Sequence, residues 1–347
     1  MIVAFHSLAF FVETPLLAWS ERVRARWFSA ASLAIVALSA FAAAMSSSRW
    51  SFLLALAVYG PASGCALCVA EGLVVEAARH SRERAMARLS LAANAGDLAV
   101  PLLLAILSCY GLGWRAAFVV AGGFALVLAI VHASARSLDR LSSGANGDPE
   151  HHAPTIREAL RMAFATRSLL GWSFACASTN LLDEVLVAFS ALHMHALGAT
   201  PGQRSFAVAA WIFGGFVGLA GLERFDGRSS ARRWLLSASA ATAIAITTLA
   251  VSHSTRMGTC ALFLIGVAGS TLHPMAKARA YAALPSRPAL VNAVGAVLLP
   301  FEMAAPVAIG IVATRAGSLW AIVCLLVAPA VVAMATWCLR GTPSPEQ

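Results

Sequence analysis

Charged residues are scarce in this chain of 347 residues, at 12% compared with about a quarter in soluble domains. The sequence also offers no hydrolytic triad, no glycine-rich phosphate-binding loop and no closed set of metal ligands. Its mean hydropathy of +0.77 leaves too little polar surface for a water-soluble fold. These absences exclude a soluble enzyme and ATP-driven transport within the chain, and we expect neither a cofactor nor a bound metal.

Hydrophobic residues make up 59% of the chain and gather in long runs. A run of about 20 apolar residues is long enough for a helix to cross a bilayer. Because lipid offers the backbone no hydrogen-bond partners, such runs are expected to be helices. The sequence therefore predicts an all-α integral membrane protein with 11 transmembrane helices, five in the first half and six in the second. They fall at about residues 1–19, 28–46, 51–75, 89–110, 115–135, 168–193, 205–222, 233–252, 258–280, 289–312 and 317–339.

The 25 lysines and arginines are distributed unevenly among the loops between these runs. Twenty fall in alternate loops and the C-terminal tail, and five fall in the remaining loops. Positively charged loops stay in the cytoplasm, so we expect a cytoplasmic C-terminus and a multi-pass protein of the bacterial inner membrane. The net charge of +9 thus reflects topology and does not indicate a nucleic-acid partner. The five arginines on the outer side are Arg49, Arg115, Arg204, Arg256 and Arg315.

Cysteine, histidine and glycine pairs in the apolar runs each have two interpretations. Cys65 and Cys68 share one helix face and either pack as small hydrophobic residues or bind a soft metal. His193 and His195 are either solvated interfacial side chains or metal ligands. We expect the two cysteines to be packing residues and the two histidines to be solvated. Glycines four residues apart predict close approach of neighbouring helices, and they occur as Gly60 with Gly64 and Gly214 with Gly218.

The chain contains an internal repeat at an offset of 202 to 206 residues. It predicts an N-terminal bundle of five spans at residues 1–135, a cytoplasmic linker at 136–167 and a C-terminal six-helix bundle with a short tail at 168–347. The span at 168–193 has no counterpart, because its mate would precede Met1, so we expect a first helix lost through a mis-assigned start or a truncation. The matched landmarks are Glu21-Arg22 with Glu223-Arg224, Gly64 with Gly269, Asp97 with Glu302, and Trp114 with Trp320.

Three loop segments carry a resemblance to a known family. Residues 17–26 (Leu-Ala-Trp-Ser-Glu-Arg-Val-Arg-Ala-Arg) resemble the loop motif Gly-x-Leu-x-Asp-Arg-x-Gly-Arg-Arg of the major facilitator superfamily. They depart from it at several positions, among them Leu17 and Arg24, where glycine is usual, and Glu21, where aspartate is usual. Residues 223–228 resemble a weaker second copy, and the Gly-Trp-Arg at 113–115 is similar to the stretch before the family's sixth helix.

The resemblance implies two bundles of parallel repeats that transport a small molecule by alternating access. It implies a monomer in the lipid bilayer and an inner-surface charge network that gates the transport cycle. Two family features are missing. The span 51–75 lacks the membrane-embedded arginine that is common in proton-coupled members. The glycine-rich pattern linked to antiporters is also missing around Pro101, where Val100 and Leu102 stand. The residues assigned to the gating network are Glu21, Arg22, Glu76, Glu223 and Arg224.

Carboxylates inside apolar runs are functional candidates because burying a charge in lipid is costly. Glu13, followed by a proline, either faces a central cavity to bind a proton or cationic group, or reaches water at the end of its span. Asp97 and Glu302 occupy matching positions in the repeat. Each is either a binding residue or a structural carboxylate that pairs with a helix terminus or a loop arginine.

Asn180, Asp183 and Glu184 form the strongest candidate cluster, since positions i, i+3 and i+4 share a helix face. Two adjacent carboxylates in lipid are not both expected to be ionised, because desolvation and like charge favour the protonated form of at least one. The cluster therefore predicts a proton-coupling site, and its alternative is a structural role in bonding a neighbouring helix. Together these residues indicate a proton-coupled secondary transporter. The other hypothesis is a transporter-like membrane sensor or partner-binding protein that does not transport.

Overall fold

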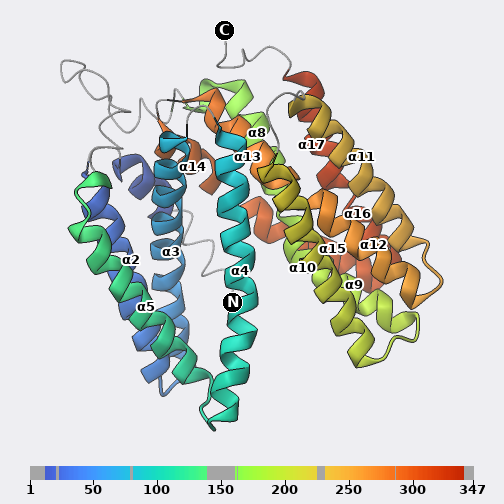
Figure 1. The fold of residues 1–347 in the computed structure, drawn as a ribbon, viewed down its shortest axis with the longest axis horizontal. Helices are drawn as coiled ribbons and strands as arrows, with labels where there is room; N and C mark the ends of the chain where they lie inside the picture. The colour runs from blue at the N-terminus through green and yellow to red at the C-terminus, as the bar shows by residue number, and fades with distance from the viewer. Residues whose placement is uncertain are drawn as a thin grey trace. The chain divides into compact units, whose positions relative to one another are not determined.

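The computed structural model describes residues 12–20, 23–78, 81–138, 161, 163–224, 231–285 and 287–339. The described residues form helices and contain no strand, as the all-α prediction requires (Figure 1). A short helical segment at residues 12–20 precedes α2 (Ala25–Met45), α3 (Arg49–Ala77), α4 (Arg82–Cys109) and α5 (Trp114–Ser134). The second half contains α8 (Arg167–Thr179), α9 (Leu181–Ala196), α10 (Pro201–Glu223), α11 (Ala231–Ala250), α12 (Thr255–Gly269), α13 (Leu272–Ala283), α14 (Pro288–Ala296), α15 (Leu299–Ala316), α16 (Ser318–Cys324) and α17 (Val327–Cys338).

Within the described ranges, nine helical stretches are long and apolar enough to cross a membrane. Each of them overlaps one predicted span, and α4 occupies the position of a tenth. The first predicted span, at residues 1–19, lies largely outside the described residues. The prediction of a multi-pass helical membrane protein is confirmed, while the count of 11 spans stays a prediction.

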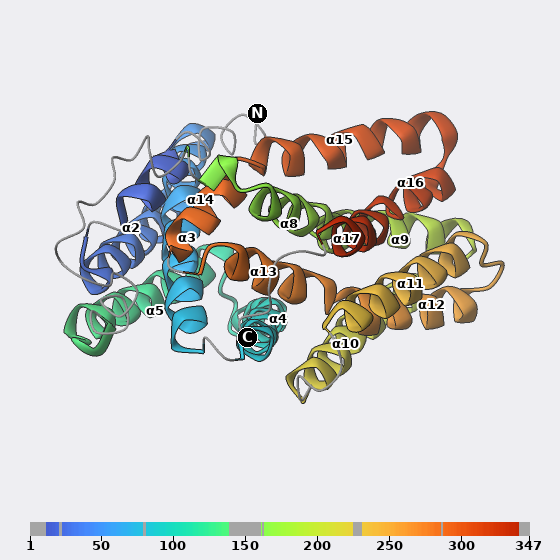
Figure 2. The ribbon, with the colours of Figure 1, turned by 90° about the horizontal axis from the view of Figure 1, so that it is seen from above.

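The chain divides into two compact units, and the first comprises Met1–Arg79, Ala95–Ala165 and Leu284–Val297. In this unit α2 packs along its length against both α3 and α5, which lie beside it in two views (Figure 1, Figure 2). Most buried residues of α2 are alanines and serines, such as Ala37 and Ala40, which let the helices approach closely. A side chain at Gly122 of α5 would collide with Phe41 of α2.

The second unit comprises His80–Asn94, Thr166–Ala283 and Leu298–Gln347. Its tightest packing joins α10 to α12, where added side chains at Gly214 and Gly218 would overlap the backbone carbonyls of Phe263 and Val267. The predicted close approach at this glycine pair is confirmed. The same prediction is wrong for Gly60, which has nothing within 4 Å of where a Cβ would lie.

The helix boundaries follow the predicted repeat, because α3 and α12 begin 206 positions apart, as do α4 and α14. The first part of α4 belongs to the second unit, and α14 belongs to the first unit. At matching positions of the repeat, each half of the chain therefore contributes a segment to the unit that the other half mainly forms. Most of the predicted linker lies outside the described residues, so the domain boundaries at 135 and 168 stay predictions.

Candidate functional site

In the described residues, α3, α4 and α5 are continuous, but their counterparts in the second half are interrupted. The α12–α13 and α16–α17 spans break at Ser270–Thr271 and Leu325–Leu326, four residues before Pro274 and Pro329. Proline lacks an N–H and clashes with the carbonyl four residues earlier, so each proline explains its break. Discontinuous helices place free backbone groups and helix ends inside a span, where transporters bind substrates and ions.

The break between α8 and α9 at Asn180 contains no proline, but the side chain of Thr179 forms hydrogen bonds there. The Thr179 hydroxyl donates to the Cys176 carbonyl at 2.7 Å and lies 3.1 Å from Nδ1 of His273. Since the only hydroxyl proton of Thr179 is used in the first bond, His273 must donate the second through Nδ1–H. This bond joins the last residue of α8 to the first turn of α13, so two broken spans meet at their breaks.

His273 was not identified from the sequence. Its position directly before a proline, within the apolar run at 258–280, could have indicated it as a candidate functional residue. Ionisable side chains within a span are functional candidates by default. The first turn of α13 thus adds an imidazole to the polar residues around the break at Asn180.

The predicted cluster lies at and just after this break. Asn180 is half-buried, and its carbonyl accepts a 3.1 Å hydrogen bond from the backbone N–H of Asp183. Asp183 is exposed in the first turn of α9, and Glu184 follows it in that helix with a side chain outside the described set. Glu302 is half-buried in the first turn of α15, beside Phe301. Phe301 packs on Phe174 of α8 with a ring-centroid distance of 5.1 Å, so this turn of α15 also lies against α8.

In the first unit, Glu13 is buried, with 8% of its surface exposed. Its carboxylate lies against Gly64 of α3, where a Cβ would come within 2.5 Å of Oε1, and Sγ of Cys68 lies 4.0 Å from the same oxygen. The hydroxyl of Thr14 is buried without a hydrogen-bond partner among the described residues. The absent side chain of Gly64 is therefore what lets Glu13 lie against α3.

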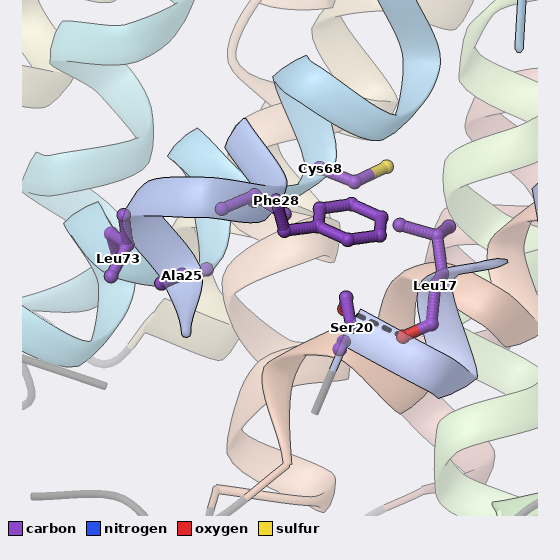
Figure 3. A pocket seen from close by; sticks show the side chains of 9 residues that line it. Leu17, Ser20, Ala25, Phe28, Cys68 and Leu73 are labelled. Carbon is purple, nitrogen blue, oxygen red and sulfur yellow. Dashed lines mark hydrogen bonds between the residues drawn. The ribbon is translucent and has the colours of Figure 1, made fainter. Parts of the chain in front are cut away.

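A cavity of about 80 Å³ is lined by Cys68 together with residues of the short segment that precedes α2 (Figure 3). Leu17 and Ser20 line it, and the Ser20 hydroxyl donates a 2.7 Å hydrogen bond to the Leu17 carbonyl. Asn292 of α14 is buried and donates to the Cys68 carbonyl at 2.9 Å. No sequence motif indicated this contact, which joins residues 224 positions apart. The other lining residues are Ala25, Phe28, Val69, Gly72, Leu73 and Ala289.

Asp97 is exposed on the later part of α4, so the structure does not place it in a buried site of the first unit. Its predicted counterpart, Glu302, is half-buried and lies in the other unit. The two residues therefore have different surroundings.

The predicted charge network stays a prediction, although one of its members, Glu223, forms an ion pair. Glu223 pairs with Arg88 of α4 at 2.9 Å, and Glu83 lies 3.8 Å from Arg279. Of these residues, the sequence had indicated only Glu223. Glu21 and Arg22 lie outside the described residues, Arg224 is exposed after α10, and Glu76 is half-buried near the end of α3. The Arg88–Glu223 pair is solvent-accessible, and pairs of this kind contribute about 0–1 kcal/mol.

Cys65 is buried and Cys68 is half-buried, as packing residues would be. The expectation of a solvated histidine pair is wrong for His193, which is buried and hydrogen-bonded, while His195 is exposed. Cys68 contacts Glu13, and the Ser252 hydroxyl donates to the Leu249 carbonyl, so Nε2 of His193 donates to Ser252 at 3.3 Å. No group of three or more metal-binding side chains occurs in the described part of the chain. The arrangement can therefore bind protons and hydrogen-bonding solutes through carboxylate, imidazole and amide groups.

The comparisons with known proteins agree with this architecture. The model of the Major Facilitator Superfamily matches residues 1–190, and the chain belongs to this family. Its members are membrane transporters of small molecules, and the chain is a multi-pass transporter of this family. No curated protein matches the sequence at a significant level.

Three solved structures show the same fold. The fucose:proton symporter FucP of E. coli has a TM-score of 0.70 at 14% identity, covering 97% of this chain and 90% of that chain. The human organic anion transporter MFSD10 (TETRAN) has a TM-score of 0.67 at 16% identity, covering 97% and 82%. The proton:xylose symporter XylE, bound to 6-bromo-6-deoxy-D-glucose, has a TM-score of 0.67 at 12% identity, covering 99% and 86%.

Proposed function

We propose that this chain is a proton-coupled secondary transporter that moves a small solute across the bacterial inner membrane by alternating access. The observation that carries the proposal is the hydrogen bond between Thr179 and His273, which joins two helix breaks lined by polar and ionisable side chains. Asn180, Asp183 and Glu184 lie at or just after the α8–α9 break in sequence, and Glu302 lies in the turn of α15 that packs on α8. These four residues are proposed to bind the solute and the proton. Glu13 and Asp97 are proposed as further proton-binding carboxylates in the first unit.

The distribution of positive charge supports the proposed orientation. Twenty of the 25 lysines and arginines lie on one side of the predicted spans, and positive charge of this kind supports a cytoplasmic location for that side and for the C-terminus. Glu21, Arg22, Glu76, Glu223 and Arg224 are then proposed to form the cytoplasmic gating network. We propose that the protein acts as a monomer without cofactor, metal or nucleic acid.

Proton movement in reconstituted vesicles tests the proposed function. The purified protein is placed in proteoliposomes that contain a pH-sensitive dye, and sugars and organic anions, the solutes named for the similar structures, are added outside. A transported solute is expected to change the internal pH, because solute and proton move together. Empty liposomes and liposomes with heat-denatured protein are the controls. A well-folded protein that binds a solute but neither exchanges it nor moves protons would instead support the sensor hypothesis.

The substitution His273→Asn tests whether the imidazole of His273 carries a proton during transport or only forms a structural hydrogen bond. The asparagine amide can donate to Thr179 in place of Nδ1–H but does not titrate, so we expect solute exchange to persist while gradient-driven accumulation and its pH dependence are lost. His193→Gln is the matched control, because it replaces a histidine that also donates to a hydroxyl, away from the breaks. Unchanged accumulation and an unchanged pH profile in His273→Asn would remove His273 from the coupling mechanism.

A further inference from the structure

A pocket of about 410 Å³ that two arginines and three serines help to line opens at the end of the first unit, where α2 passes into α3 and where α5 begins. Two arginines line it that lie 66 positions apart in the sequence, Arg49 and Arg115. They are two of only five cationic residues predicted on the outer side of the protein. The remaining lining residues are Ser46, Ser47, Ser48, Phe52 and Trp114.

One of the two guanidinium groups is held in place. Nη2 of Arg115 donates to the carbonyl of Ser46 at 3.0 Å, and the guanidinium lies 4.8 Å from the ring centroid of Trp114. Trp114 is in turn fixed by Phe52, at a centroid distance of 5.4 Å. This bond uses one of the five donors of Arg115, so the others remain available to a ligand.

The charge of the two arginines is not neutralised within the pocket. Residues 46–50 and 110–115 contain no aspartate or glutamate, and no acidic residue lines the pocket. Among the described residues, Arg49 has no salt-bridge partner, and its side chain is exposed in the first turn of α3. Two nearby cations without a counter-ion attract an anion with several acceptor oxygens, and arginine with serine is a typical phosphate-binding combination.

The surroundings of the pocket indicate that this phosphate belongs to a lipid. Trp50, which follows Arg49 in the chain, and Tyr110, in the turn before α5, are 67% and 77% exposed, as is typical of aromatic residues at a membrane–water interface. On the side of α5 that carries Arg115, the following turns expose the apolar side chains of Val119, Leu126 and Ile130. An acyl chain can lie along this face while its headgroup occupies the pocket, whereas free phosphate would make no use of it.

We propose that this pocket binds the phosphate of an anionic phospholipid such as phosphatidylglycerol, with Arg49 and Arg115 as the phosphate-binding residues. Binding would fix the α2–α3 loop against the start of α5. The proposal concerns a lipid site at one end of the first unit and does not depend on the identity of the transported solute.

Native mass spectrometry of the full-length protein in a neutral detergent tests the proposal, because it counts bound lipids directly. Phosphatidylglycerol is titrated into the wild type, Arg49→Gln, Arg115→Gln and the control Arg256→Gln, which removes an exposed arginine from the start of α12 in the second unit. We expect about fivefold weaker binding for each pocket arginine removed, because one arginine contributes about 1 kcal/mol to the binding of an anionic lipid. The control should bind as the wild type does. Dioleoylglycerol, which has no phosphate, should show no arginine-dependent binding.

Two results would overturn the proposal. If Arg49→Gln binds phosphatidylglycerol as tightly as the wild type, the pocket does not hold the headgroup. If millimolar inorganic phosphate displaces the lipid, the pocket is a site for free phosphate. Since Arg115→Gln also breaks the bond to Ser46, the decisive variant is Arg49→Gln.

Discussion

Replacing Asp183 by Asn and Glu184 by Gln together is expected to abolish gradient-driven accumulation of the solute while leaving counterflow exchange measurable. An amide keeps the size and much of the hydrogen bonding of a carboxylate, but it cannot take up and release a proton. Exchange of one solute molecule for another needs no net proton movement, so it should survive. A gradient of one pH unit could drive about tenfold accumulation for one coupled proton, and this factor is the expected loss.

The measurement is uptake of labelled solute into proteoliposomes, with and without an imposed pH gradient. The pair Asp148→Asn with Glu150→Gln, in the predicted linker, is the matched control because it removes the same two charges far from the breaks in sequence. Full accumulation by the Asp183 and Glu184 double variant would exclude both residues from the coupling mechanism. Loss of exchange as well as accumulation would instead assign them to solute binding or to the fold.

The substitution Gly218→Val is expected to cause the largest loss of stability in the second unit. A Cβ at this position would overlap the carbonyl oxygen of Val267 and lie 2.8 Å from the carbonyl carbon, so α10 and α12 would have to separate. Backbone atoms cannot move aside as a flexible side chain can, and overpacking of this kind costs about 1–3 kcal/mol. We therefore expect a clear fall in melting temperature in detergent.

Gly221→Ala is the control for this prediction. Gly221 lies on the same helix, and nothing lies within 4 Å of where its Cβ would be. Its replacement should leave the melting temperature unchanged or slightly higher, because alanine favours a helix more than glycine does. Equal melting temperatures for Gly218→Val and Gly221→Ala would mean that the close approach of α10 and α12 does not contribute to stability.

Prolines illustrate how far the sequence could predict the helix breaks. Pro274 and Pro329 coincide with interruptions four residues earlier, as the chemistry of proline requires. Pro61 and Pro101, however, lie inside α3 and α4, which continue past them. The α8–α9 break at Asn180 occurs without any proline. The positions of the prolines therefore predict where a helix can break, while packing against neighbouring helices decides whether it does.

The protein class and the positions of the spans could be predicted from the amino-acid sequence without any structure. Both depend on the number and kind of residues in one contiguous run, and lipid admits only a helix for such a run. The repeat that relates α3 to α12 and α4 to α14 could also be predicted, because it is a correspondence along the chain.

The pairs of side chains that meet could be identified only in the folded chain. Folding brings Glu13 to Gly64, Thr179 to His273 and Arg49 to Arg115, and none of these pairs shares a sequence motif. The rotation of each helix about its axis selects the residues that face a partner. When a run is apolar on every side, its sequence carries almost no periodicity to specify that rotation, so packing between helices has to set it.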